Sequence, residues 1–62
     1  MNSKEAFKIE DRLLGEISQA IDSGRKFTER EQKIYRAFLA MQDLRLYLRE
    51  VERNEGRQAE NL

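Results

Sequence analysis

Apolar side chains recur every three or four residues through the second half of the chain, the spacing of one face of an α-helix. Written as a heptad over residues 27–51, the pattern has an a row and a d row. The a row holds Phe27, Ile34, Met41 and Leu48, and the d row holds Ala37, Leu44 and Val51. The sequence predicts that these two rows form one seam against another helix.

A second apolar face lies on the far side of the same helix, at b and f positions of the heptad. A hairpin of two helices leaves these positions in water, so the face indicates a further partner. The partner is a second copy or a different protein, and the alternative is that these residues are isolated surface apolar side chains. We expect an interface made of Tyr35, Leu39, Gln42, Leu46, Arg49 and Val51.

The first half of the chain carries an apolar stripe that spans roughly 160° of a helical wheel. A stripe of this width exceeds what one neighbouring helix requires, and it fits a helix lying in a groove between two others. Its members are Ala6, Phe7, Ile9, Leu13, Leu14, Ile17, Ala20 and Ile21.

Capping signals place the ends of two helices. Asn2 or Ser3 can cap a first helix over about residues 3–22, and Gly24 suits the left-handed residue that closes it. Residues 23–28 then form a short turn, which forces the two helices to run antiparallel.

The second helix is expected over about residues 29–55, with Thr28 and Glu31 as its capping box and Gly56 as its stop. Residues 1–56 thus form one domain, and residues 57–62 are expected to be a frayed tail.

The second helix should be longer than the first, at roughly 40 Å against roughly 28 Å. Because the turn aligns the helices at one end, residues beyond about Leu48, including Val51, should overhang the first helix. The predicted fold is therefore an all-α antiparallel helical hairpin, paired as a homodimeric four-helix bundle.

Composition removes several classes of chemistry. The 62 residues include no cysteine and no histidine, so disulfides, thiolate or imidazole metal sites and catalysis by either side chain are excluded. Twelve basic and twelve acidic residues cancel, so no long-range field attracts nucleic acid or an anionic membrane. We expect no cofactor, no small-molecule substrate and no enzymatic activity.

The first 14 residues, MNSKEAFKIEDRLL, have scattered charges and no apolar run of the kind found in a signal peptide. No stretch approaches the length and apolarity of a membrane span. A cytoplasmic protein that does not bind membranes is the expectation.

Glu10 falls inside the apolar stripe of the first helix, where an unpaired carboxylate would be costly. We expect an ion pair with an arginine of the second helix or of the second chain, and a catalytic role is disfavoured because a hairpin offers little concave volume. Asp43, Glu50 and Glu52 form at most a weak site for a hard cation, so no metal is expected.

Arg45, Arg49 and Arg53 recur every four residues and form a basic ridge that Arg57 continues. Such a ridge can bind phosphate, nucleic acid or an acidic protein surface. The favoured interpretation is a solvated face paired with neighbouring acids, namely Glu50, Glu52 and Glu55.

Size, pattern and the lack of reactive groups favour a small interaction module, a regulator, adaptor or inhibitor of another macromolecule that acts as a homodimer. The alternative is a nucleic-acid-binding regulatory dimer that uses the basic ridge.

Overall fold

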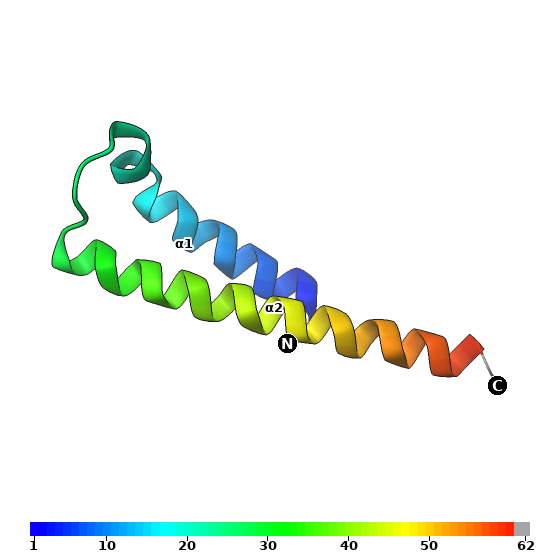
Figure 1. Ribbon diagram of the computed structural model, residues 1–62. Helices are drawn as coiled ribbons and strands as arrows, with labels where there is room; N and C mark the ends of the chain where they lie inside the picture. The colour runs from blue at the N-terminus through cyan, green and yellow to red at the C-terminus, as the bar shows by residue number, and fades with distance from the viewer. Residues whose placement is uncertain (61–62) are drawn as a thin grey trace.

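Two helices joined by one turn make up the protein (Figure 1). The computed structural model describes residues 1–60, with side chains through residue 56. Helix α1 (Ser3–Ser23) and helix α2 (Glu29–Glu60) pack against each other as an antiparallel hairpin. The prediction of an all-α helical hairpin is confirmed.

Helix α1 begins and ends with two local motifs. The Asn2 side chain accepts a hydrogen bond from the backbone N–H of Glu5 at 2.9 Å, which caps the first turn. Gly24 has a φ of 68°, in the left-handed region that glycine adopts without strain. Its N–H donates to Ile21 O and the next N–H, from Arg25, donates to Ala20 O. This pair of bonds is a Schellman motif.

Helix α2 begins at a reciprocal capping box and ends later than expected. The N–H of Glu31 donates to Thr28 Oγ1, and the N–H of Thr28 donates to the Glu31 carboxylate. The helix then continues through Gly56 to Glu60, so Gly56 does not stop it. A glycine inside a helix costs only about 1 kcal/mol, and the chain has no proline to force an end. The backbone of residues 57–60 is thus helical, and residues 61–62 lie outside the described part of the chain.

Helix α2 meets α1 with its a and e rows rather than with the predicted a and d rows. The a residues Ile34, Met41 and Leu48 are half-buried, whereas Ala37 and Leu44 of the d row are exposed. The e row is buried or half-buried and consists of Glu31, Phe38, Arg45 and Glu52. Helix α2 is therefore rotated about its own axis, so that the e row faces α1 in place of the d row. Three of the four residues in the e row are charged.

The overhang of α2 begins after Glu52, not after Leu48. The Ser3 N–H and hydroxyl both donate to the Glu52 carboxylate, which brings the start of α1 beside this part of α2. Figure 1 shows the same arrangement, with the blue start of α1 beside the yellow segment of α2. Val51 is accordingly half-buried within the hairpin, so the prediction that α1 leaves it uncovered is wrong.

The hairpin has a very small core for its length. The buried apolar residues are Ala6, Ile17 and Ala20, and Ile17 is the single large side chain among the fully buried ones described. The fold measures 53 × 17 × 15 Å with a radius of gyration of 15.4 Å. A compact domain of this length would have a radius of about 11 Å. Most apolar side chains therefore lie at the surface.

Candidate interaction surface

The centre of the helix–helix seam is held by the ion pair between Glu10 and Arg45. Arg45 Nε donates to Glu10 Oε2 at 2.5 Å, and the side chains are 20% (Arg45) and 8% (Glu10) exposed. The Arg45 guanidinium also lies 5.8 Å from the centre of the Phe7 ring, within cation–π range. The ion pair predicted for Glu10 is present, and its partner comes from α2 of the same chain.

The open end of the hairpin is closed by Glu52, which binds the first residue of α1 in addition to the Asn2 cap. The Ser3 N–H and Oγ donate to its two carboxylate oxygens at 3.0 and 2.5 Å. These bonds lower the pKa of Glu52, because they stabilise its ionised form. The charge also lies at the positive end of the α1 dipole.

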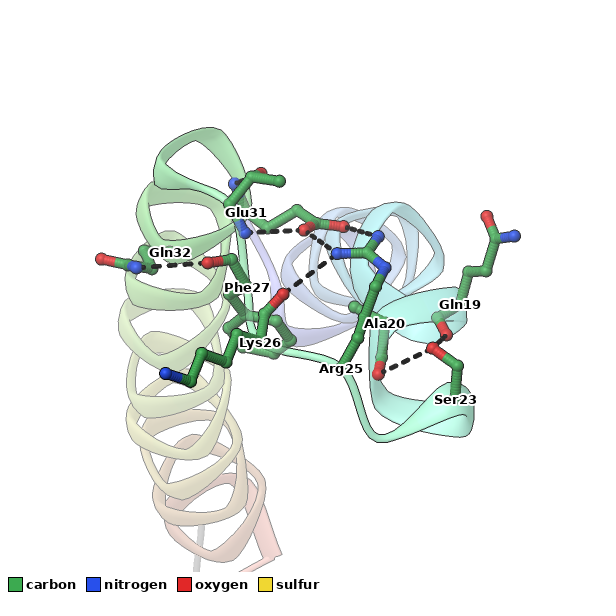
Figure 2. Close-up of polar contacts among 9 residues, drawn as sticks. Gln19, Ala20, Ser23, Arg25, Lys26, Phe27, Glu31 and Gln32 are labelled. Carbon is green, nitrogen blue, oxygen red and sulfur yellow. Dashed lines mark hydrogen bonds and ion pairs between the residues drawn. The ribbon is translucent and has the colours of Figure 1, made fainter.

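The turn end is closed by a bidentate ion pair between Arg25 and Glu31 (Figure 2). Both guanidinium Nη atoms donate to the Glu31 carboxylate at 2.7 Å. The hydrogen bonds from Arg25 and then from the Thr28 N–H lower the pKa of Glu31 to about 2. Figure 2 shows the guanidinium lying between the end of α1 and the start of α2.

Acid should weaken the hairpin through this carboxylate. A depressed pKa means that the stabilisation is complete above the ordinary value of 4.5 and is lost as the pH falls toward 2. We therefore expect the melting temperature at fixed chain concentration to fall between pH 5 and pH 2, as Glu52 also titrates in this direction. Glu31→Gln should flatten that profile while lowering the value at pH 7. An unchanged profile in this variant would contradict the assignment.

Once α1 has taken the a and e rows of α2, six large apolar side chains remain exposed on one side of the hairpin. Their exposed fractions lie between 37% for Leu14 and 54% for Phe7. We call this set the apolar face, and it consists of Phe7, Leu14 and Ile21 from α1 with Tyr35, Leu39 and Leu46 from α2.

Helical geometry puts these six residues on the same side. The three from α1 are seven residues apart, and they lie roughly 60–100° around the helix from buried Ala6. The three from α2 lie at roughly the same angle from the residues of α2 that face α1. Because the two helices are antiparallel, equal rotations away from the seam lead to the same side of the hairpin. A hollow of about 480 Å³ agrees, because Phe7 lines it together with Arg45 and Arg49.

The apolar face continues around the turn as a short aromatic cluster. The rings of Phe27 and Tyr35 lie 5.6 Å apart, and those of Tyr35 and Phe38 lie 6.3 Å apart. Phe27 therefore packs over the turn end of the hairpin.

The opposite side of the hairpin carries both apolar side chains and ion pairs. Leu13, Ile34 and Ala37 line a hollow there whose rim carries Arg30 and Lys33. These two cations are paired, Arg30 with Glu16 at 3.5 Å and Lys33 with Glu29 at 3.9 Å. Exposed apolar side chains also occur on this side, namely Ile9, Leu44 and Tyr47.

The structure divides the predicted interface residues between two sides. Tyr35, Leu39 and Leu46 are exposed on the apolar face, with Gln42 half-buried beside them. Arg49 is exposed at the edge of this face, while half-buried Val51 lies toward the opposite side.

The part of this face that α1 contributes was not predicted from the sequence. Phe7, Leu14 and Ile21 counted as members of one wide stripe, although their spacing of seven residues could have separated them from the buried row.

The basic ridge is not a continuous row of free arginines. Arg45 is engaged by Glu10, and Glu52 binds Ser3 rather than a ridge arginine. Arg49 and Arg53 are exposed, and within residues 1–56 neither forms an ion pair. The side chain of Arg57 lies outside the described residues.

Within the described chain, no three acidic residues are close enough to hold a metal ion. Neither helix has, over the same residues, an apolar stretch long enough to cross a membrane.

These features describe a class of protein, a two-helix hairpin with an ion pair in its helix–helix seam and an apolar face that is exposed to solvent. Comparison of the chain with protein families, curated proteins and solved structures found no match.

Proposed function

We propose that the protein is a non-enzymatic interaction module that associates with a second copy through the apolar face and, as a homodimer, regulates, bridges or inhibits another macromolecule. The observation that carries the proposal is the imbalance between a core with one large fully buried side chain and a surface with six large apolar ones on one side. Exposed apolar patches of this kind mark interaction sites.

The exposed area supports association. The chain exposes 5253 Å², whereas a compact protein of its 7.4 kDa mass exposes about 4,200 Å². The excess of about 1,000 Å² is close to the roughly 800 Å² that each partner buries in a standard interface. Pairing of two hairpins would therefore bring the surface of each chain into the normal range.

The small core of the hairpin also supports association with a second copy. A short chain whose core is this small is marginally stable alone, and the chain has neither a disulfide nor a histidine or cysteine metal site to compensate. Burial of the apolar face is the remaining source of stability.

A nucleic-acid-binding dimer is the second candidate. Lys4, Lys8 and Arg49 line the hollow beside the Phe7 ring, and none of the three has an ion-pair partner within residues 1–56. The candidate ranks second because Arg45, the fourth cation of the hollow, is held by Glu10. A steep loss of affinity for DNA or RNA with added salt would favour it.

Replacing Leu39 and Leu46 together by Glu should convert the dimer to a monomer, because the change places four carboxylates in the apolar interface of each dimer. Sedimentation equilibrium at a concentration where the wild type is dimeric measures the effect. The matched control replaces Arg36 and Asn54 by Glu, since both are exposed on the polar back of α2. A Leu39→Glu, Leu46→Glu variant that stays dimeric contradicts the proposal.

A further inference from the structure

The hollow beside Phe7, at the open end of the hairpin, combines positive charge with apolar surface. Its volume is about 480 Å³, and its described lining contains no acid and consists of Ser3, Lys4, Phe7, Lys8, Arg45 and Arg49. The Phe7 ring is 54% exposed. Lys4, Lys8 and Arg49 are exposed, and none of them has an ion-pair partner within residues 1–56. The hollow therefore offers contacts to a ligand that is both anionic and apolar.

Arg45 is the fixed hydrogen-bond donor of this hollow. Its Nε donates to Glu10 Oε2 at 2.5 Å, and its Nη2 donates to Glu10 Oε1 at 3.4 Å. The third guanidinium nitrogen, Nη1, forms no hydrogen bond within residues 1–56. Because Glu10 and the Phe7 ring already hold the guanidinium in place, Arg45 can bind an anion with little further loss of side-chain freedom.

Three acidic side chains border the hollow and limit the negative charge that it can accept. Glu10 is paired with Arg45, and Glu52 binds the first residue of α1. Asp11 is exposed one helical turn beyond Phe7. These three acids, set against the four cations of the lining, leave one net positive charge. The hollow thus matches a ligand with a single negative charge.

The other exposed charges toward this end of the hairpin are mixed in sign. Arg53 lies one turn beyond Arg49, whereas Glu50 and Glu55 lie roughly 100° or more around α2 from Arg49. Glu5 lies on the opposite side of α1. A nucleic-acid backbone that extended beyond the hollow would meet these acids as well as the cations. A ligand with one carboxylate would meet the hollow alone.

We propose that the hollow binds an acidic peptide segment of a partner protein. One carboxylate of the segment binds Arg45 and the neighbouring lysines, and an adjacent apolar side chain packs on the Phe7 ring. The volume accommodates a pair of side chains, and a fold only 17 × 15 Å across leaves them open to solvent on one side. A peptide can continue along the helices from there, whereas a free small molecule would stay largely exposed.

The inference rests on the proposed interaction function and adds the site that holds the target. It does not depend on the homodimer, because all the residues of the hollow belong to one chain.

NMR titration of the isotope-labelled chain with a blocked peptide of sequence Gly-Phe-Asp-Gly, in about 150 mM NaCl, tests the proposal. We expect saturable shifts of the backbone amides of Lys4, Phe7 and Lys8, with a dissociation constant of about 1 mM. The same peptide with Asn in place of Asp should bind at least about tenfold more weakly, because it lacks the charge. Absence of shifts at these residues up to about 10 mM peptide overturns the proposal.

A pair of charge variants shows whether binding is local to the hollow. Lys4→Gln with Lys8→Gln should raise the dissociation constant about tenfold, as two exposed charges each contribute about threefold. The matched control, Lys26→Gln with Arg36→Gln, removes the same charge from exposed positions away from the hollow and should leave binding unchanged. Circular dichroism should show equal helicity in both, because lysine, arginine and glutamine have similar helix propensities. Equal weakening in the two double variants overturns the site.

Two further measurements separate this proposal from the others. Oligothymidylate that binds at the hollow in the same salt, when the peptide does not, would assign the hollow to nucleic acid and overturn the proposal. Sedimentation equilibrium of the peptide-bound sample reports the homodimer independently. A monomer that binds the peptide overturns the homodimer alone, and a dimer that does not bind it overturns the peptide site alone.

Discussion

Arg45→Met should destabilise the hairpin by about 3 kcal/mol, because it leaves the Glu10 carboxylate buried without its partner. Methionine keeps most of the apolar length of the arginine, so the loss reports on the charge rather than on packing volume. The substitution also removes the cation from the Phe7 ring, which lies 5.8 Å away. Urea unfolding followed by circular dichroism, at one chain concentration, gives the free energy of unfolding.

The double variant Glu10→Met, Arg45→Met should recover most of that loss, because two apolar side chains can replace a buried ion pair at little cost. Arg36→Met is the matched control. Arg36 is exposed and forms no ion pair within residues 1–56, so its replacement should change stability by less than about 0.5 kcal/mol. A double variant as unstable as Arg45→Met would show that the pair does more than neutralise a buried charge.

Ile17→Ala should cost about 3 kcal/mol, because Ile17 is the one large side chain that the described fold buries completely. Ala20, the buried residue one turn further along α1, is too small to fill the cavity. In a hairpin with so small a core, this loss is a large part of the total stability. We expect a broad, low-temperature melting transition in place of a cooperative one.

Ile9→Ala is the control for this substitution. It removes the same atoms from a side chain that is 39% exposed, so its effect should stay near or below 1 kcal/mol. Equal losses from the two variants would place the stabilising core elsewhere than around Ile17.

Local signals in the sequence predict the hairpin well. The caps at Asn2, Gly24 and Thr28 act through neighbours within a few residues, so their patterns are visible in the chain itself. Gly56 is the exception, because a glycine is only a weak helix terminator and no proline follows it.

The rotation of α2 against α1 could not be read from apolar spacing. Two rows, a with d or a with e, can each form a seam with the a residues Ile34, Met41 and Leu48. Partners that are distant in sequence select the second, since Arg45 finds Glu10 and Glu52 finds Ser3. An arginine partner was expected for Glu10, and its position in the e row, at Arg45, brings that row to the seam. The d residues Ala37 and Leu44 are exposed for this reason.

The central claim is that a single hairpin leaves its apolar face unfilled and that a second copy fills it. Sedimentation equilibrium of the intact chain over a hundredfold concentration range, with circular dichroism alongside, tests this most directly. We predict a dimer mass with high helicity at the upper concentrations and a concentration-dependent loss of both on dilution. A helical chain of monomer mass throughout that range would contradict the claim.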